Sequence, residues 1–175
     1  MGGIYVVWKN QEAKEEAYKL MLMQQKALLE GETDLIANLA NSSALLNQTL
    51  QDTVFAGYYL FKNEELILGP FQGNVSCVHI AMGKGVCGEA AEKNQTLIVE
   101  NVLEHKNYIA CDSAARSEIV VPMKKGDQLV GVLDLDSSEI GMYDQIDQFY
   151  LEQYVSLLLD NLNLNFLILS KKMVI

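Results

Sequence analysis

Apolar side chains that recur three and four residues apart predict helices at the start of the chain. Between residues 14 and 29, one helical face collects Ala17, Leu20, Met21, Gln24, Ala27 and Leu28. Gly31 is suited to end this helix, and Thr33 or Asp34 can cap a second helix that runs to Leu50. We therefore predict two amphipathic helices before residue 51.

The pattern changes to short β-prone segments from residue 54 onward. They cover residues 54–61, 66–68, 75–82, 96–99, 119–123 and 129–135. Gly69 and Pro70 are expected to end the second of these strands, and residues 124–127 form a hairpin signal. A short helix is predicted over 83–94, a long loop over 102–117, and a closing helix from Gln145 to about Ile168.

This order predicts an α+β fold, in which N- and C-terminal helices pack against a central antiparallel sheet. The 175 residues suffice for one domain. We assign residues 1–13 to an N-terminal extension, 14–162 to the single domain, and 163–175 to a tail that continues the last helix.

Composition narrows the classes of partner and compartment. Half of the residues are apolar, which is incompatible with disorder, and the net charge of −10 argues against nucleic acid and anionic membranes as partners. The apolar run at residues 163–169 is too short to span a bilayer. Three cysteines and no targeting segment favour a reducing compartment, so we expect a cytoplasmic protein. The choice between a monomer and a homodimer stays open.

The segment GKGVCG at residues 83–88 matches the glycine pattern of dinucleotide-binding turns, with Glu100 at the end of the next strand. The predicted helix is short for a crossover, and a hairpin follows instead of further βαβ units. The alternative is that the glycines turn a strand tightly into a helix, and we expect no cofactor.

Cys77, Cys87 and Cys111 show no C-x-x-C spacing. Two interpretations are open: a zinc site that combines the three cysteines with His79, or three unrelated buried thiols. We expect no metal. Small and polar residues follow Cys111, which predicts a reachable thiol, and Arg116 is a cation that could favour its thiolate.

Carboxylates and aromatic residues form two further candidate groups. Asp134 and Asp136 share one face of a strand, and hairpin pairing brings Glu118 near the same strand end. Because converging carboxylates repel one another, the pKa of at least one of them should rise, and that carboxyl group could then donate a proton. The alternatives are that the three acids are solvated or that they bind a cation. Phe55 and Tyr59 lie on the same face of one predicted strand. They are either core residues or the apolar wall of a ligand site.

Several motifs together resemble the free methionine-(R)-sulfoxide reductases, which are stand-alone GAF domains. The resemblance covers roughly residues 14–160 and rests on segments at 28–32, 36–41, 69–73, 83–88, 109–112, 117–122 and 131–137, with Cys77 between them. It implies a GAF fold and thioredoxin-dependent reduction of the R sulfoxide of free methionine.

The same resemblance implies a role for each candidate residue. Cys111 would be the nucleophile, Cys77 the principal resolving cysteine and Cys87 a third thiol that could also resolve. The residues implied to bind the substrate are Glu118, Asp134, Asp136, Tyr59 and Phe55.

Two departures from the family pattern concern the site. Phe55 replaces a tryptophan, and Asn107 with Tyr108 replaces a Gly-His pair. The alternative function is a GAF module that binds a small molecule or senses redox state without turnover.

Overall fold

The computed structural model describes residue 8 and residues 10–162. Within these described residues, four helices and six strands confirm the α+β prediction. The helices are α1 (Gln11–Leu29), α2 (Leu35–Thr49), α3 (Gly85–Lys93) and α4 (Gln145–Asn161). The strands are β1 (Thr53–Lys62), β2 (Glu65–Gly73), β3 (His79–Ala81), β4 (Leu97–Val99), β5 (Ser117–Lys125) and β6 (Gln128–Ser137), with a single turn of 3-10 helix at Val102–Glu104.

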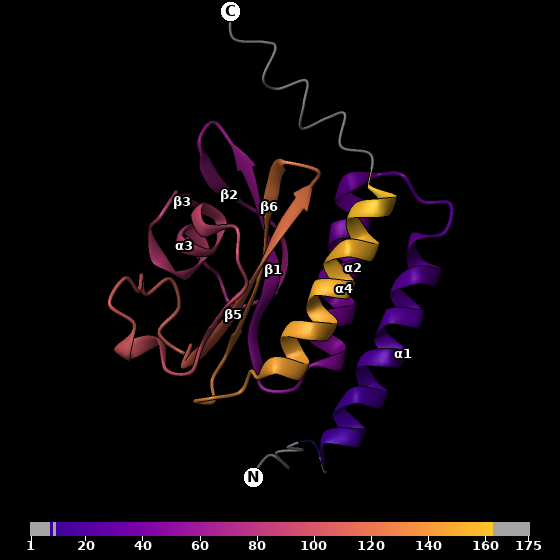
Figure 1. Ribbon diagram of the computed structural model, residues 1–175, viewed down its shortest axis with the longest axis horizontal. Coiled ribbons are helices and arrows are strands. Elements are labelled where there is room, and N and C mark those ends of the chain that lie inside the picture. Colours follow the sequence, from indigo (N-terminus) through magenta and orange to yellow (C-terminus); the bar gives the residue numbers. More distant parts are fainter. Residues whose placement is uncertain (1–7, 9, 163–175) are drawn as a thin grey trace, which may run out of the picture.

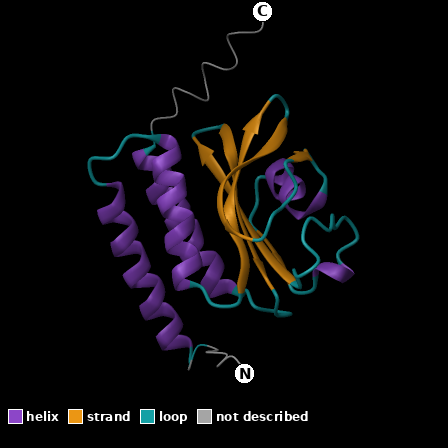
Figure 2. Ribbon diagram, turned by 180° about the vertical axis from the view of Figure 1, so that it is seen from behind, coloured by secondary structure: helices purple, strands orange, loops and turns teal. Residues whose placement is uncertain are grey.

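The strands form one antiparallel sheet in the order β3-β2-β1-β6-β5-β4. Helices α2 and α4 cover one face of this sheet, and α1 lies outside them (Figure 1). Helix α3 and the long loop before β5 lie on the opposite face, as the reverse view also shows (Figure 2). Each face therefore has its own apolar core, and the smaller core beneath α3 contains Phe55, Tyr59 and Cys87.

Local capping explains where the long helices begin. The Asn10 side chain accepts a hydrogen bond from the Ala13 amide, so α1 starts at Gln11, three residues before the predicted position. Asp34 caps α2, and Asp144 caps α4 through a reciprocal capping box. Lys14 and Tyr18 of α1 both donate to the buried Asp147 carboxylate, which fixes α1 against α4. The predicted continuation of α4 past residue 162 lies outside the described residues, as does most of the N-terminal extension.

Two strand predictions were wrong. Gly69 and Pro70 do not end β2, because they fall at a register shift between Gly57 and Tyr59 of β1, where a missing proline N–H is tolerated. The strand predicted over 75–82 is restricted to β3. Residues 74–78 are irregular, and the Cys77 carbonyl oxygen accepts from the Tyr59 side chain, although the Val78 carbonyl oxygen still accepts from the Leu68 amide of β2.

The glycine motif at residues 83–88 has a backbone explanation. Gly83 and Gly85 adopt φ values of 72° and 62°, in the left-handed region that favours glycine. A Cβ at Gly88 would lie 2.4 Å from the Ala81 carbonyl oxygen. The motif thus lets α3 pack closely against the end of β3, which supports the structural interpretation of these glycines.

No described helix combines the length and the hydropathy that a membrane span requires.

Candidate active site

Three carboxyl side chains meet where β5 begins and β6 ends. Glu118 lies directly opposite Asp136 in the strand pair, and Asp134 lies opposite Val120 two residues further along. The exposed fractions are only 6% for Glu118, 4% for Asp134 and 8% for Asp136. All three line the same small cavity, which confirms the predicted convergence and excludes the interpretation as solvated acids.

Burial and mutual repulsion make these groups hold protons. Burial raises the pKa of Glu118 well above its usual 4.5, and the charges of Asp134 and Asp136 raise it further. Burial also raises the pKa of Asp134 from 3.8 to about 7. The pKa of Asp136 is raised by burial and then by Asp134 and Asp112. The cluster therefore provides protonated carboxyl groups near neutral pH.

The structure joins Cys77 and Cys111 in a disulfide, with their Cα atoms 5.1 Å apart. Cys87 is a free thiol on α3, where it is buried, and its Sγ lies 3.8 Å from Glu118 Oε1. Burial, together with the charges of Asp134 and Glu118, raises the pKa of this thiol. Because two thiols are bonded to each other and His79 pairs with Glu65, the zinc site of three cysteines and His79 is not formed.

Cys111 of the disulfide and the three carboxyl groups line one cavity of about 30 Å³. Its lining brings together Tyr59, Ser76, Ile80, Gly85, Val86, Cys87, Tyr108, Ile109, Cys111, Asp112, Glu118, Asp134 and Asp136. Of the two predicted aromatic residues, only Tyr59 lines the cavity. Phe55 is buried beside Tyr59 and stacks on Phe71 with ring centroids 5.3 Å apart.

Tyr59 also holds the segment that carries Cys77. Its hydroxyl donates to the Cys77 carbonyl oxygen at 2.9 Å and lies 2.9 Å from Ser76 Oγ. Two residues before Ser76, the side-chain amide of Asn74 donates to the Asp112 carboxylate at 2.8 Å. Ser76 and Asp112 were not predicted as site residues, and in the sequence their only signal is that each adjoins a candidate cysteine.

The loop before Cys111 is fastened to α3 by polar side chains. Asn107 donates to the Gly83 carbonyl oxygen at 2.9 Å, and His105 Nε2 lies 3.0 Å from Glu89 Oε2. The amide of Asn107, one of the two departures, thus ties the loop to the turn that starts α3. Beyond Cys111, the Arg116 guanidinium donates to the carbonyl oxygens of Ser113 and Ala115, so it orders the loop backbone.

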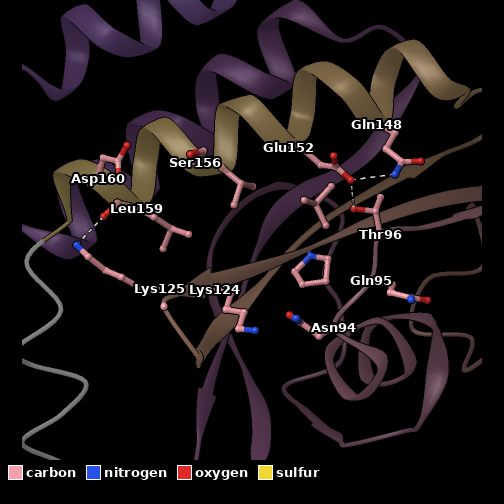
Figure 3. A pocket seen from close by; sticks show the side chains of 14 residues that line it. Asn94, Gln95, Thr96, Lys124, Lys125, Gln148, Glu152, Ser156, Leu159 and Asp160 are labelled. Carbon is pink, nitrogen blue, oxygen red and sulfur yellow. Dashed lines mark hydrogen bonds between the residues drawn. The ribbon is translucent and has the colours of Figure 1, made fainter.

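A wider groove of about 680 Å³ lies away from this chemistry. It runs between α4, β5 and the connection from α3 to β4 (Figure 3). Lys125 donates across it to the Leu159 carbonyl oxygen, and Glu152 accepts from Thr96 and Gln148. The groove contains neither a thiol nor any of the three buried carboxyl groups.

Comparison with known proteins gives one consistent family. Residues 40–162 match the GAF domain family. The free methionine-R-sulfoxide reductase of Escherichia coli is 45% identical over 143 residues, which cover 82% of this chain and 87% of that protein.

Two solved structures extend this similarity to the fold. The reduced form of fRMsr of Staphylococcus aureus has a TM-score of 0.80 and 45% identity, covering 82% of this chain and 94% of that one. The free methionine-R-sulfoxide reductase of Neisseria meningitidis, in complex with its substrate, has a TM-score of 0.83 and 35% identity, covering 99% and 100%.

The raised pKa of Asp134 predicts a pH-dependent cost in stability. Its folded pKa of about 7 exceeds the ordinary 3.8, so the folded protein holds a proton that the unfolded chain releases as pH rises from about 4 to about 7. Stability contributed by this proton is present at low pH and lost through pH 7. Between pH 5 and pH 8, the free energy of unfolding of the wild type should therefore fall by about 3 kcal/mol more than that of Asp134→Asn.

Urea unfolding of the oxidised protein at both pH values measures this difference. Asp127→Asn, in the exposed β5–β6 turn, is the matched control and should follow the wild type. Equal losses of stability in Asp134→Asn and the wild type would contradict the burial of an ionisable Asp134.

Proposed function

Because the chain belongs to the free methionine-R-sulfoxide reductase family of GAF domains, we propose that it reduces the R sulfoxide of free L-methionine to methionine. The observation that carries the proposal is the disulfide between Cys77 and Cys111 beside a buried carboxyl cluster. A disulfide in this position is the expected product of one catalytic cycle.

The first step requires both a nucleophile and an acid. The Cys111 thiolate attacks the electrophilic sulfur of the sulfoxide, while a protonated carboxyl group donates to the sulfoxide oxygen. Attack forms an S–S bond between Cys111 and the substrate. The protonated oxygen then passes from the substrate sulfur to Cys111 Sγ as a hydroxyl group, the S–O and S–S bonds to the substrate break, methionine leaves with the electron pair of the S–S bond, and Cys111 becomes a sulfenic acid. The raised pKa values of Glu118 and Asp134 keep protons available for this step near neutral pH.

The second step restores the disulfide observed here. The Cys77 thiol attacks the Cys111 sulfenic acid, an S–S bond forms, and the hydroxyl group leaves as water. Cys77 is the favoured resolving residue because its sulfur already bonds to Cys111, whereas Cys87 is buried beside Glu118. An external dithiol then reduces the disulfide and is itself oxidised.

Substrate binding belongs to the reduced state. A cavity of about 30 Å³ is far too small for a free amino acid. Cleavage of the disulfide removes the covalent link between the Cys111 loop and the Cys77 segment, and this allows the cavity to widen. The buried carboxylates then offer partners for the α-ammonium group, and Tyr59 offers an apolar ring, with Phe55 packed behind it.

We propose thioredoxin as the external dithiol and the cytoplasm as the compartment. The disulfide is half-buried, and the exposed apolar side chains Val75, Val78 and Ile109 lie next to it in sequence. Such side chains suit docking of a protein dithiol. A reversible disulfide and a free thiol at Cys87 are consistent with a reducing compartment.

Cysteine variants test the two thiol roles. Cys111→Ser should abolish turnover, because it removes the attacking sulfur. Cys77→Ser should form about one methionine per chain and then stall at the sulfenic acid. Methionine counted over time with thioredoxin and its reductase gives both results. Sustained turnover by Cys111→Ser would contradict the nucleophile, and sustained turnover by Cys77→Ser would assign resolution to Cys87. A redox sensor would show no sustained turnover even as the wild type.

The docking surface is tested by introducing a charge. Val78→Asp should lower kcat/KM for thioredoxin about tenfold, because it places a carboxylate in the apolar contact. Turnover driven by a small dithiol should stay unchanged. Met23→Asp is the control, since Met23 is also an exposed apolar residue and lies on α1, behind the opposite face of the sheet. Equal losses with both reductants would show that Val78 does not mediate docking.

A further inference from the structure

The thiol of Cys87 and two buried carboxyl groups form a compact set of metal donors. One ligand atom each from Cys87, Glu118 and Asp134 lies within 4.8 Å of the other two. The three residues come from three different elements, α3, β5 and β6, so they surround a point in space. Bonds to zinc of about 2.0 Å for oxygen and 2.3 Å for sulfur place donors roughly 3.5 Å apart, so shifts of about 1 Å would complete the site.

An unpartnered oxygen gives independent evidence for a ligand. Asp134 Oδ1 is fully buried and has no hydrogen-bond partner among the described residues, although Asp134 is only 4% exposed. A buried carboxylate oxygen without a partner is costly, and binding of a cation is one way to satisfy it.

The ion pairs of the described residues lie away from these carboxyl groups. Among the described residues, the ion pairs of lysine and histidine side chains that surround the fold are made with other carboxylates, such as Asp147 and Glu89. The negative charge must be balanced by bound protons or by a ligand. In the disulfide state the cavity of about 30 Å³ has room for a single ion and excludes an amino acid.

We propose that the oxidised protein binds one thiophilic divalent cation through Cys87, Glu118 and Asp134. Zn²⁺ is the representative of this class of ion. Binding forms one Zn–S and two Zn–O bonds, and the protons of the thiol and the carboxyl groups pass to solvent. Zinc accepts mixed sulfur and oxygen donors, and its fourth position would face the cavity. Mg²⁺ and Ca²⁺ require more oxygen donors and gain nothing from the thiolate.

The binding does not depend on the proposed reductase activity. The expected consequence of binding rests on that proposed activity. An ion held by Glu118 and Asp134 occupies carboxyl groups that the proposed reaction uses, so zinc would inhibit the enzyme.

Zinc titration of the oxidised protein against a competing chelator tests the site without any substrate. The disulfide must be intact, because it removes Cys77 and Cys111 as alternative ligands. We expect one Zn²⁺ per chain, an affinity that rises with pH because protons are released, and no displacement by excess Mg²⁺. Cys87→Ser and Asp134→Asn should each weaken binding at least tenfold, whereas Asp127→Asn should not.

Cobalt gives a spectroscopic signature of the same site. Co²⁺ bound by the wild type should show a thiolate-to-metal charge-transfer band, and this band should be lost in Cys87→Ser. Circular dichroism checks that each variant is folded. Absence of stoichiometric Zn²⁺ in the wild type, or wild-type affinity in folded Cys87→Ser and Asp134→Asn, would overturn the proposal and leave only adventitious surface binding. Neither result would affect the test of the reductase by cysteine variants.

Discussion

The pairing of β5 with β6 puts three acidic side chains into one buried place, and the rest of the site is built around that constraint. The register that sets Glu118 opposite Asp136 fixes their separation, and α3 covers them with an apolar surface that carries Cys87. Without a neighbouring cation, the cluster can stay buried only by holding protons or a ligand. Its cost in stability and its ability to donate a proton therefore have the same physical origin.

The disulfide links this cluster to the control of access. Cys111 and Cys77 lie on two irregular segments, and each is fastened by side chains from the regular scaffold. Tyr59 of β1 holds the carbonyl of Cys77, and Asn107 fastens the loop before Cys111 to the start of α3. In the oxidised state these contacts leave a cavity for little more than a water molecule. The chemistry and the admission of substrate are thus coupled through one covalent bond.

Much of the fold could be predicted from the sequence because the hydrophobic periods and capping residues are local. The hairpin and the convergence of Glu118 with Asp134 and Asp136 follow from the period of two in a strand. The path of β2 through Pro70 could not, because it depends on a register shift in β1 that no local pattern shows. The hydrogen bond from Tyr59 to the Cys77 carbonyl oxygen and the position of Phe55 behind Tyr59 likewise depend on tertiary packing, whereas the resemblance had already implied the pairing of Cys77 with Cys111.

A single-turnover reaction decides whether the protein reduces free methionine sulfoxide through its thiols. Protein reduced beforehand and freed of reductant is mixed with excess racemic free methionine sulfoxide, and methionine and remaining thiols are counted by chiral chromatography and thiol titration. We expect about one methionine per chain, drawn only from the R form, with the loss of two thiols and formation of the Cys77–Cys111 disulfide. No methionine, with all three thiols intact, would contradict it and favour a ligand-sensing GAF module.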